Sequence, residues 1–325
     1  MMVKVAVVIT TYNLENYISV ALDSVLLQKT NFNYKILIAD DCSSDNTVSI
    51  LKSYKEKYGD KIELFLSDTN MGSLKNSNRV FDKLQCEYFS FLDGDDYWIG
   101  DNRLQKQVDF MDSHPDYMMC GGNTYYLRGS DSSELVIKPK KTEQTYYFGD
   151  LLKDQIPFVH TSSILVRNTI FINGLPECYR IAEDTFENCA LRGEDFRRIL
   201  HLEQGPIYVA SDVLSVYRIH EKGLWQGSSP LKRTIEAAIA SNFYYKFFNA
   251  KYGQYFKKKA LNSYRILMAS LTIDYGILGD YLLDSNCTKL LTGLFMDLQK
   301  DNNAVRSVPL IKKKVLSRLL RILFY

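Results

Sequence analysis

The sequence lacks the cysteine spacings that mark disulfide frameworks and zinc sites. None of its six cysteines forms a C-x-x-C pair or sits at a zinc-ligand spacing. Disulfide frameworks suit small secreted domains, whereas this chain has 325 residues. We therefore expect reduced thiols in a cytoplasmic protein.

Long apolar runs and an excess of one charge are also absent. No apolar run approaches the roughly 18 residues that a membrane-spanning helix needs. The apolar start MMVKVAVVIT is short and lacks a cleavage pattern. A net charge of +2 gives no electrostatic basis for binding nucleic acid. We expect a soluble or peripheral protein with no nucleic-acid partner.

Two glycine-rich nucleotide-binding loops are missing as well. The turn after the first expected strand reads TTYNLEN, so it is not the G-x-G-x-x-G turn of a dinucleotide-binding fold. The P-loop pattern G-x-x-x-x-G-K-S/T does not occur either. NAD chemistry and P-loop phosphoryl transfer are therefore disfavoured.

Strand-like and helix-like segments alternate along the chain. Apolar, β-branched runs predict strands, and periodic apolar residues between them predict helices. The expected strands are 3–10, 34–39, 61–66, 87–92, 160–167 and 206–220, and the expected helices are 15–28, 44–58, 73–84, 103–113 and 193–205. This alternation predicts an α/β fold with a doubly wound, mostly parallel sheet flanked by helices.

Polar residues follow three of these strands at the point where each one ends. They are Thr10 and Tyr12, then Asp40 and Asp41, and then Asp93, Asp95 and Asp96. In doubly wound sheets, ligands bind beyond the carboxyl ends of the strands. We therefore expect a ligand site at this edge of the sheet.

The segment FLDGDDYW contains three carboxylates whose like charges repel one another. Some positive group is therefore expected to offset their negative charge. A bound Mg²⁺ or Mn²⁺ would do so, since both take oxygen ligands and Mg²⁺ binds through one or two carboxylates plus substrate phosphates. The alternative is a solvated acidic turn, which is what most D-x-D triplets are. The position directly after a buried strand favours the metal site.

Four blocks of the sequence together resemble family 2 glycosyltransferases of the GT-A fold. They are VAVVITTYNLENYISVALDSVLLQ, ILIADDCSSDNT, DTNMGSLKNSNRVF, and FSFLDGDDYW with the following NRLQKQVDF. The resemblance implies inverting transfer of a sugar from a nucleotide diphosphate donor to a hydroxyl of a glycan or lipid-linked acceptor. It further implies a UDP-sugar donor, with thymidine open as an alternative base, and a role in surface polysaccharide or lipooligosaccharide synthesis.

The resemblance also implies roles for residues on the nucleotide side. Thr10 and Tyr12 match the loop that packs against the base. Asp41 matches the acid that accepts a hydrogen bond from the uracil ring, and Asp40 lies beside it. Lys75 falls near a position that often carries a basic residue contacting base or phosphate.

For the acidic segment, the resemblance implies contacts with the sugar and the metal ion. Asp93 is expected at the ribose or sugar hydroxyls, with Gly94 next to it in the donor site. Asp95 is expected to be the first ligand of Mn²⁺ or Mg²⁺, and Asp96 a further ligand.

Two histidines and a tryptophan are further candidates. His220 matches a place that supplies a metal or diphosphate contact, and His160 lies where the family lines the donor-sugar pocket. Each histidine has the alternative of a structural role in the core or a loop. For Trp98, stacking on a sugar face and core packing are both open.

Inversion requires a general base on the acceptor side, opposite the leaving diphosphate. Two pairs compete for this role, Glu183-Asp184 and Glu194-Asp195. We favour the second, because it follows Gly193 and opens a helix that leads to the closing strand, as in the family pattern. Asp195 is expected to be the base and Glu194 to orient the acceptor.

The C-terminal third lies outside the resemblance. We expect a catalytic domain at 1–228 and a helical C-terminal region at 229–325. In residues 307–325, one apolar helical face is surrounded by lysines and arginines, which suits contact with an anionic membrane surface on the cytoplasmic side. A helical cap packed on the catalytic domain is the alternative.

Two other functions stay open. A nucleotidyltransferase also places acidic residues and a metal at a phosphate, but it would be expected to carry a glycine-rich, basic loop where TTYNLEN stands. A non-catalytic sugar-nucleotide-binding protein is the other, and the acidic residues at both expected positions argue against it.

Overall fold

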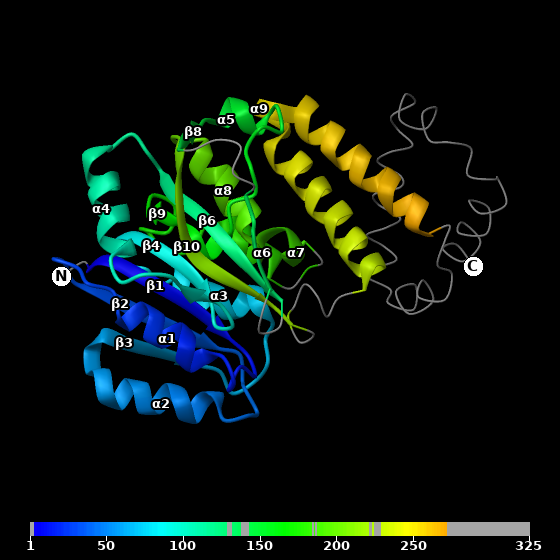
Figure 1. Ribbon diagram of the computed structural model, residues 1–325. Coiled ribbons are helices and arrows are strands. Elements are labelled where there is room, and N and C mark those ends of the chain that lie inside the picture. The colour runs from blue at the N-terminus through cyan, green and yellow to red at the C-terminus, as the bar shows by residue number, and fades with distance from the viewer. Residues whose placement is uncertain are drawn as a thin grey trace. The chain divides into compact units, whose positions relative to one another are not determined.

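The structure is a computed structural model that describes residues 3–128, 132–137, 143–183, 185, 187–220, 223 and 229–271. The chain forms two compact units (Figure 1). The first contains Met1–Arg180 and Arg197–Glu221, and the second contains Ile181–Phe196 and Lys222–Tyr325. The functional division expected at residue 228 stays a prediction. Residues 307–325, expected at a membrane surface, lie outside the described residues.

A mixed sheet runs through the first unit in the order β3-β2-β1-β4-β9-β6-β10-β5. Its parallel half consists of β1 (Val3–Thr11), β2 (Tyr34–Asp40), β3 (Ile62–Leu66) and β4 (Cys86–Asp93). The connecting elements are α1 (Ile18–Leu26), α2 (Thr47–Tyr58), η1 (Gly59–Lys61) and α3 (Ser73–Phe81). The predicted doubly wound, mostly parallel α/β fold is confirmed.

The other half of the sheet is mixed. β10 (Ile207–Ile219) runs parallel to β6 (Met119–Arg128), whereas β9 (Leu165–Arg167) is antiparallel to β4 and β6, and β5 (Tyr97–Trp98) is antiparallel to β10. The shorter strands and the remaining helices up to residue 202 are β7 (Ser132–Leu135), β8 (Gln144–Tyr146), α4 (Arg103–Ser113), α5 (Phe148–Leu151), η2 (Thr161–Ser163), α6 (Glu177–Ala182), α7 (Asn188–Leu191) and α8 (Glu194–Leu202).

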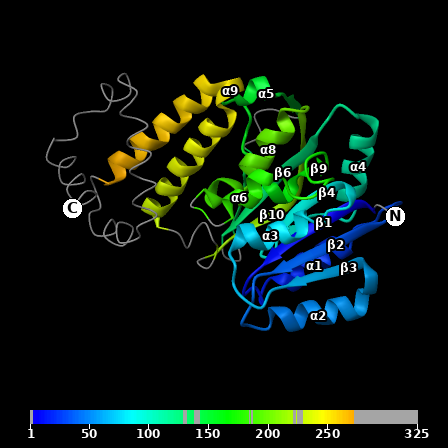
Figure 2. The ribbon, with the colours of Figure 1, turned by 180° about the vertical axis from the view of Figure 1, so that it is seen from behind.

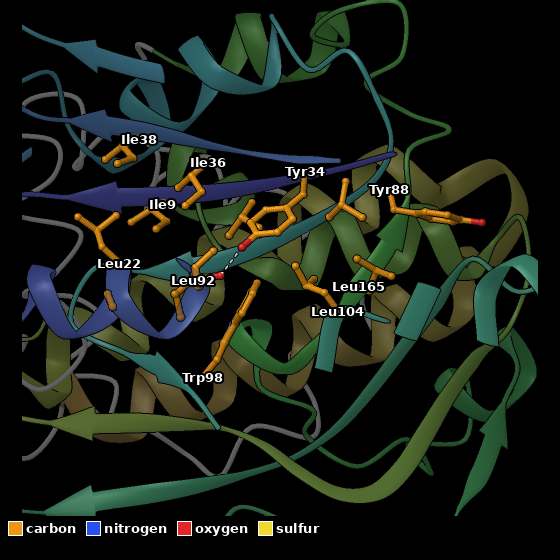
Figure 3. Packing of buried hydrophobic residues seen from close by; sticks show 14 of the residues in the cluster. Ile9, Leu22, Tyr34, Ile36, Ile38, Tyr88, Leu92, Trp98, Leu104 and Leu165 are labelled. Atoms are coloured by element: carbon orange, nitrogen blue, oxygen red, sulfur yellow. Dashed lines mark hydrogen bonds between the residues drawn. The ribbon is translucent and has the colours of Figure 1, made fainter. Parts of the chain in front are cut away.

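Helices cover both faces of the parallel strands, which explains why those strands read as continuous apolar runs. α1 packs on one face, where its apolar residues join Leu92 and Trp98 in the core (Figure 3). α3 covers the other face, with the rings of Phe81 and Phe89 edge to face at 5.7 Å. The two sides of the sheet are seen in Figure 1 and Figure 2.

The strand register brings the carboxyl ends of β1, β2 and β4 to the same edge. Thr10 lies opposite Asp93 of β4, and Thr11 lies opposite Asp40 of β2. A slip of one residue would turn every side chain of a strand to the other face. The buried apolar pattern therefore determines which polar residues meet at this edge.

The second unit is helical in its described part. Its long helix is α9 (Pro230–Leu271), which has non-helical backbone at Tyr252. The Tyr244 hydroxyl donates to the Ala190 carbonyl at 2.8 Å, and aromatic rings of α9 pack around Phe196. The expected helical C-terminal extension is confirmed as far as residue 271. None of the helices within the described ranges has the length and apolar character that crossing a bilayer requires.

Stability should fall in acid because a buried histidine resists protonation. His201 is 1% exposed, its Nδ1–H donates to the Arg197 carbonyl at 2.6 Å, and its Nε2 has no hydrogen-bond partner in the described part of the chain. Burial lowers the pKa of His201 from 6.5 to about 4. Between these values the unfolded chain binds a proton that the folded chain does not. This group alone should cost about 2 kcal/mol of unfolding free energy between about pH 7 and pH 5.

Urea titrations at both pH values measure this loss. His201→Gln should flatten the pH dependence, because the substituted side chain does not titrate. His114→Gln, at an exposed histidine, serves as the control for loss of an imidazole. A His201→Gln protein that lost as much stability in acid as the unsubstituted chain would contradict the explanation.

Candidate active site

Thr10, Asp93 and Gly94 are in direct contact at the carboxyl edge of the sheet. Thr10 Oγ1 donates to Asp93 Oδ1 at 3.3 Å, and the Gly94 amide donates to the Thr10 carbonyl at 3.0 Å. A Cβ on Gly94 would lie 3.0 Å from that carbonyl oxygen and 3.0 Å from Leu14 Cδ1. A side chain at residue 94 would therefore crowd the close approach between β1 and the turn after β4.

Short polar side chains tie the loops after β1 and β2 together. Asn13, at a φ of 54°, accepts from the Ser44 amide at 2.8 Å, and its own amide donates to Ser43 Oγ at 2.8 Å. Asp40 is fully buried and accepts from both the amide and the hydroxyl of Ser43. Tyr12 keeps 48% of its surface exposed. The loop that carries the exposed ring of Tyr12 is thus fixed by the loop after β2.

Asp41 is used differently from Asp40, because it holds the loop between β3 and α3. Its Oδ1 accepts from the Met71 amide at 2.8 Å and its Oδ2 from the Gly72 amide at 2.9 Å. Gly72 has a φ of 85°, which favours glycine. Lys75 lies in the first turn of α3. Each oxygen of Asp41 keeps a second lone pair, with which it can accept a hydrogen bond from a ligand.

Asp93, Asp95 and Asp96 form the acidic corner, and their basic partners come from the end of β10. His220 Nε2 lies 2.9 Å from Asp95 Oδ2. Arg218 donates from Nη1 to the Asp95 carbonyl at 2.6 Å. His220 was predicted from the sequence and Arg218 was not, although the Arg-x-His spacing at the end of the strand is a signal for it. The repulsion among the carboxylates is therefore offset in part by the protein itself.

Asp96 faces the interior of the first unit. It has no exposed surface, and its Oδ1 accepts from the Arg218 amide at 3.1 Å. Its Oδ2 has no hydrogen-bond partner among the described residues. Burial, reinforced by the charges of Asp95 and Asp93, raises the pKa of Asp96 well above its usual range. Asp96 thus holds the end of β10 against the turn after β4.

His160 lies behind the acidic corner. Its Nδ1 is 3.9 Å from Asp96 Oδ2 and 2.6 Å from Ser162 Oγ. The Ser162 amide also donates to this Nδ1 at 3.3 Å, so Nδ1 is an acceptor and the proton of the neutral ring is on Nε2. Burial lowers the pKa of His160 to about 4, which keeps the ring neutral at physiological pH. Its expected contact with the donor sugar stays a prediction.

The acidic corner fits a divalent cation through two groups. Asp95 offers a carboxylate oxygen and His220 an imidazole nitrogen, within hydrogen-bond distance of each other. Carboxylates suit Mg²⁺ and Mn²⁺, and imidazole is the commonest metal ligand among side chains. The described part of the chain contains no group of three or more His, Cys, Asp or Glu side chains that could hold a metal. Phosphates of a bound nucleotide would therefore have to complete the coordination.

The candidates for the general base belong to the second unit. Glu194 and Asp195 form the first turn of α8, where the helix dipole favours negative charge. Of the competing pair, Glu183 is half-buried and Asp184 lies outside the described residues. The choice between the two pairs stays a prediction.

Comparison with known protein sequences points to a family of enzymes. The family model for glycosyl transferase family 2 matches residues 6–175, just over half of the chain. An uncharacterised protein of Mycobacterium tuberculosis is 27% identical over 223 residues, which cover 69% of this chain and 61% of that protein. TarS of Staphylococcus aureus, a poly(ribitol-phosphate) β-N-acetylglucosaminyltransferase, is 28% identical over 228 residues, covering 68% of this chain and 36% of TarS. The chain thus spans less than two thirds of the length of these relatives.

Solved structures share the fold. The crystal structure of S. aureus TarS residues 1–349 with UDP matches with a TM-score of 0.55 at 20% identity, covering 83% of this chain and 73% of that one. The mannosyltransferase PcManGT of Pyrobaculum calidifontis, in complex with GDP-Man and Mn²⁺, matches with a TM-score of 0.50 at 15% identity, covering 100% and 81%. At these identities the likeness concerns the fold alone.

Gly94→Ala should destabilise the edge where the acidic corner meets β1. The new methyl group meets a backbone carbonyl that cannot move freely, so we expect a loss of about 1–3 kcal/mol of unfolding free energy, measured by urea titration. Gly149→Ala is the matched control, because a Cβ there has nothing within 4 Å. Equal stability of the two variants would show that the close approach is not a constraint.

Proposed function

Because the chain belongs to glycosyl transferase family 2, we propose that it transfers a sugar from a UDP-sugar to a hydroxyl of a glycan or lipid-linked acceptor, with inversion at the anomeric carbon. The observation that carries the proposal is the acidic corner, met by His220 and Arg218 at the carboxyl edge of the sheet. Synthesis of a surface polysaccharide or lipooligosaccharide is the proposed setting, since TarS is named for acting on a phosphate polymer.

The nucleotide is proposed to bind at the loops after β1 and β2. Tyr12 offers its exposed ring to the base, and Asp41 offers a lone pair to the N3–H group of uracil. Thymine carries the same N3–H group, so Asp41 does not separate the two bases. Asp40 fixes the loop that precedes α2, and Lys75 is proposed to contact the base or a phosphate.

The sugar and the diphosphate are proposed to lie at the acidic corner. Asp93, oriented by Thr10, accepts from hydroxyls of the ribose or the donor sugar. His160, whose Nδ1 is already engaged, presents Nε2–H to a hydroxyl of the donor sugar. Gly94 lets the turn approach β1 closely enough to bring these groups together.

Asp95 and His220 would hold the Mn²⁺ or Mg²⁺ ion. When bound, this ion offsets the charge that develops on the leaving diphosphate. Arg218, anchored on the Asp95 carbonyl, adds a fixed positive charge at the same place. We assign Asp96 to the support of β10, because its carboxyl group would have to turn outward to reach the ion.

Asp195 is proposed as the general base, with Glu194 orienting the acceptor. Asp195 takes the proton of the acceptor hydroxyl while that oxygen forms its bond to the anomeric carbon. The bond from the same carbon to the diphosphate oxygen breaks on the opposite face, which gives inversion. A lipid-linked acceptor would bring the enzyme to the cytoplasmic membrane face, where residues 307–325 are proposed to contact anionic lipid.

A thermal-shift panel of UDP-, TDP- and GDP-sugars, each with and without Mn²⁺, tests the proposal. A ligand at about 100 times its Kd stabilises the folded state by about 2.7 kcal/mol, so a UDP-sugar should raise Tm when Mn²⁺ is present. Absence of a shift with every nucleotide-sugar would overturn the assignment. A shift without slow hydrolysis or transfer of the sugar would indicate a non-catalytic binding protein.

Asp95→Asn should weaken Mn²⁺-dependent binding of UDP by at least about tenfold, because it removes the charged ligand of the ion. Isothermal titration calorimetry with and without Mn²⁺ measures the effect. Asp101→Asn is the control, since Asp101 follows in the same segment and pairs with Lys29 on the surface at 2.6 Å. Equal UDP affinity in both variants would show that Asp95 is not a ligand of the ion.

Asp195→Asn should lower the rate of sugar transfer by about 100-fold or more, because the acceptor hydroxyl loses its base. The Kd of UDP should stay within about twofold of the unsubstituted value, since the donor side is intact. Glu183→Gln is the matched change in the competing pair and should keep most of the turnover. The opposite pattern would move the base to that pair.

A further inference from the structure

Arg103, the first residue of α4, carries a positive charge into the core of the first unit. It is 1% exposed, and it donates to Gln107 Oε1 at 2.9 Å, Ser90 Oγ at 3.1 Å and the Ser162 carbonyl at 2.5 Å. Within the described ranges, no carboxylate forms an ion pair with it. Burial lowers the pKa of Arg103 to about 9, so it remains charged at physiological pH. A buried cation with only neutral partners is costly, which calls for a reason beyond filling space.

A second side chain donates a hydrogen bond to the Ser162 carbonyl. Trp98 Nε1–H donates to the Ser162 carbonyl at 2.9 Å, and the Arg103 guanidinium lies 3.9 Å from the centre of the Trp98 ring. Trp98 is 3% exposed, so it belongs to the core and not to a sugar-stacking surface. Two donors, one from β5 and one from α4, therefore fix one carbonyl of η2.

The turn fixed in this way packs against β10. Ser162 Oγ lies 2.9 Å from Ser215 Oγ, and the His160 ring lies 4.5 Å from the Tyr217 ring. Ser215 and Tyr217 are two residues apart on a strand, so their side chains point to the same face. The turn thus supports the last part of β10 from one side.

The supported segment is the one that serves the acidic corner. Directly after Tyr217, the Arg218 amide donates to Asp96, and His220 reaches Asp95 two residues later. A shift of the turn would move this segment, and with it the distance between His220 and Asp95.

We propose that Arg103 is a positioning residue for the cation and diphosphate site. It acts through the Ser162 turn and the end of β10, and it does not itself touch the acidic corner. The proposal rests on the proposed function for its ligand. Arginine suits the task because its planar fork donates in several fixed directions and stacks on an aromatic ring, which lysine does not reproduce.

Three variants and one control test the proposal. Trp98→Phe removes the N–H that reaches Ser162, together with one ring of the indole, and keeps an aromatic ring beside Arg103. Arg103→Lys keeps the charge without the fork, and Arg103→Met removes both. Lys106→Met is the control, because Lys106 lies on the same helix and its ammonium group pairs with Asp212 on the surface at 3.2 Å.

Calorimetry with Mn²⁺ and UDP gives the first readout. In Trp98→Phe and Arg103→Lys, the affinity for Mn²⁺ in the presence of UDP should fall about tenfold, and further in Arg103→Met. The affinity for UDP without Mn²⁺ should change by less than about twofold, and Lys106→Met should change neither. A lower Tm with unchanged Mn²⁺ affinity would mean that Arg103 only stabilises the core, which overturns the proposal.

Imidazole NMR signals give a readout that does not depend on the ligand, and four histidines make assignment practical. The signals of His160 and His220 should move in Trp98→Phe and Arg103→Lys, while that of His114 stays. Unmoved His160 and His220 signals in both folded variants would overturn the proposal. If the unsubstituted chain binds no UDP with Mn²⁺, the proposed function fails, and the NMR result still decides whether Arg103 positions the end of β10.

Discussion

Compensation of negative charge at the acidic corner is the constraint on which the rest of the first unit depends. Three carboxylates cannot sit together at the end of a buried strand unless basic groups and hydrogen-bond donors meet them. The end of β10 brings Arg218 to Asp95 and Asp96, and His220, directly after the strand, contacts Asp95. The strand that lies between β6 and β5 in the sheet therefore also completes the acidic corner.

Buried carboxylates also fix the loops at the same edge of the sheet. Asp40 uses its oxygens on its own loop, through Ser43, and Asp41 uses one lone pair of each oxygen on the next loop, through Met71 and Gly72. These backbone contacts fix the loops before any ligand arrives. A site whose groups are already in place loses less conformational entropy when it binds a ligand.

The parallel half of the fold was predictable because both faces of its inner strands β1, β2 and β4 are largely buried. Their apolar runs end where the strands end, so Asp41, Asp93 and Asp95 were placed at the correct edge from sequence alone. Arg103 was not predictable, because NRLQKQVDF reads as an ordinary polar helix start. Its partner Ser162 lies 59 positions further along the chain. Local pattern cannot show that a charged residue is buried by such distant segments.

Asp96 shows the same limit at the centre of the site. In DGDD it reads as equivalent to Asp95, yet the two carboxyl groups face opposite environments. The difference arises from the Arg218 amide, 122 positions away in the chain, which draws Asp96 inward. The carboxylate of Asp95 instead contacts His220 through Oδ2. A cation bound to Asp95 would have to lie beside this hydrogen bond or take its place. A nucleotide diphosphate would add phosphate ligands and bring negative charge toward Arg218. Cation and nucleotide should therefore bind more tightly together than apart, by the same factor for each.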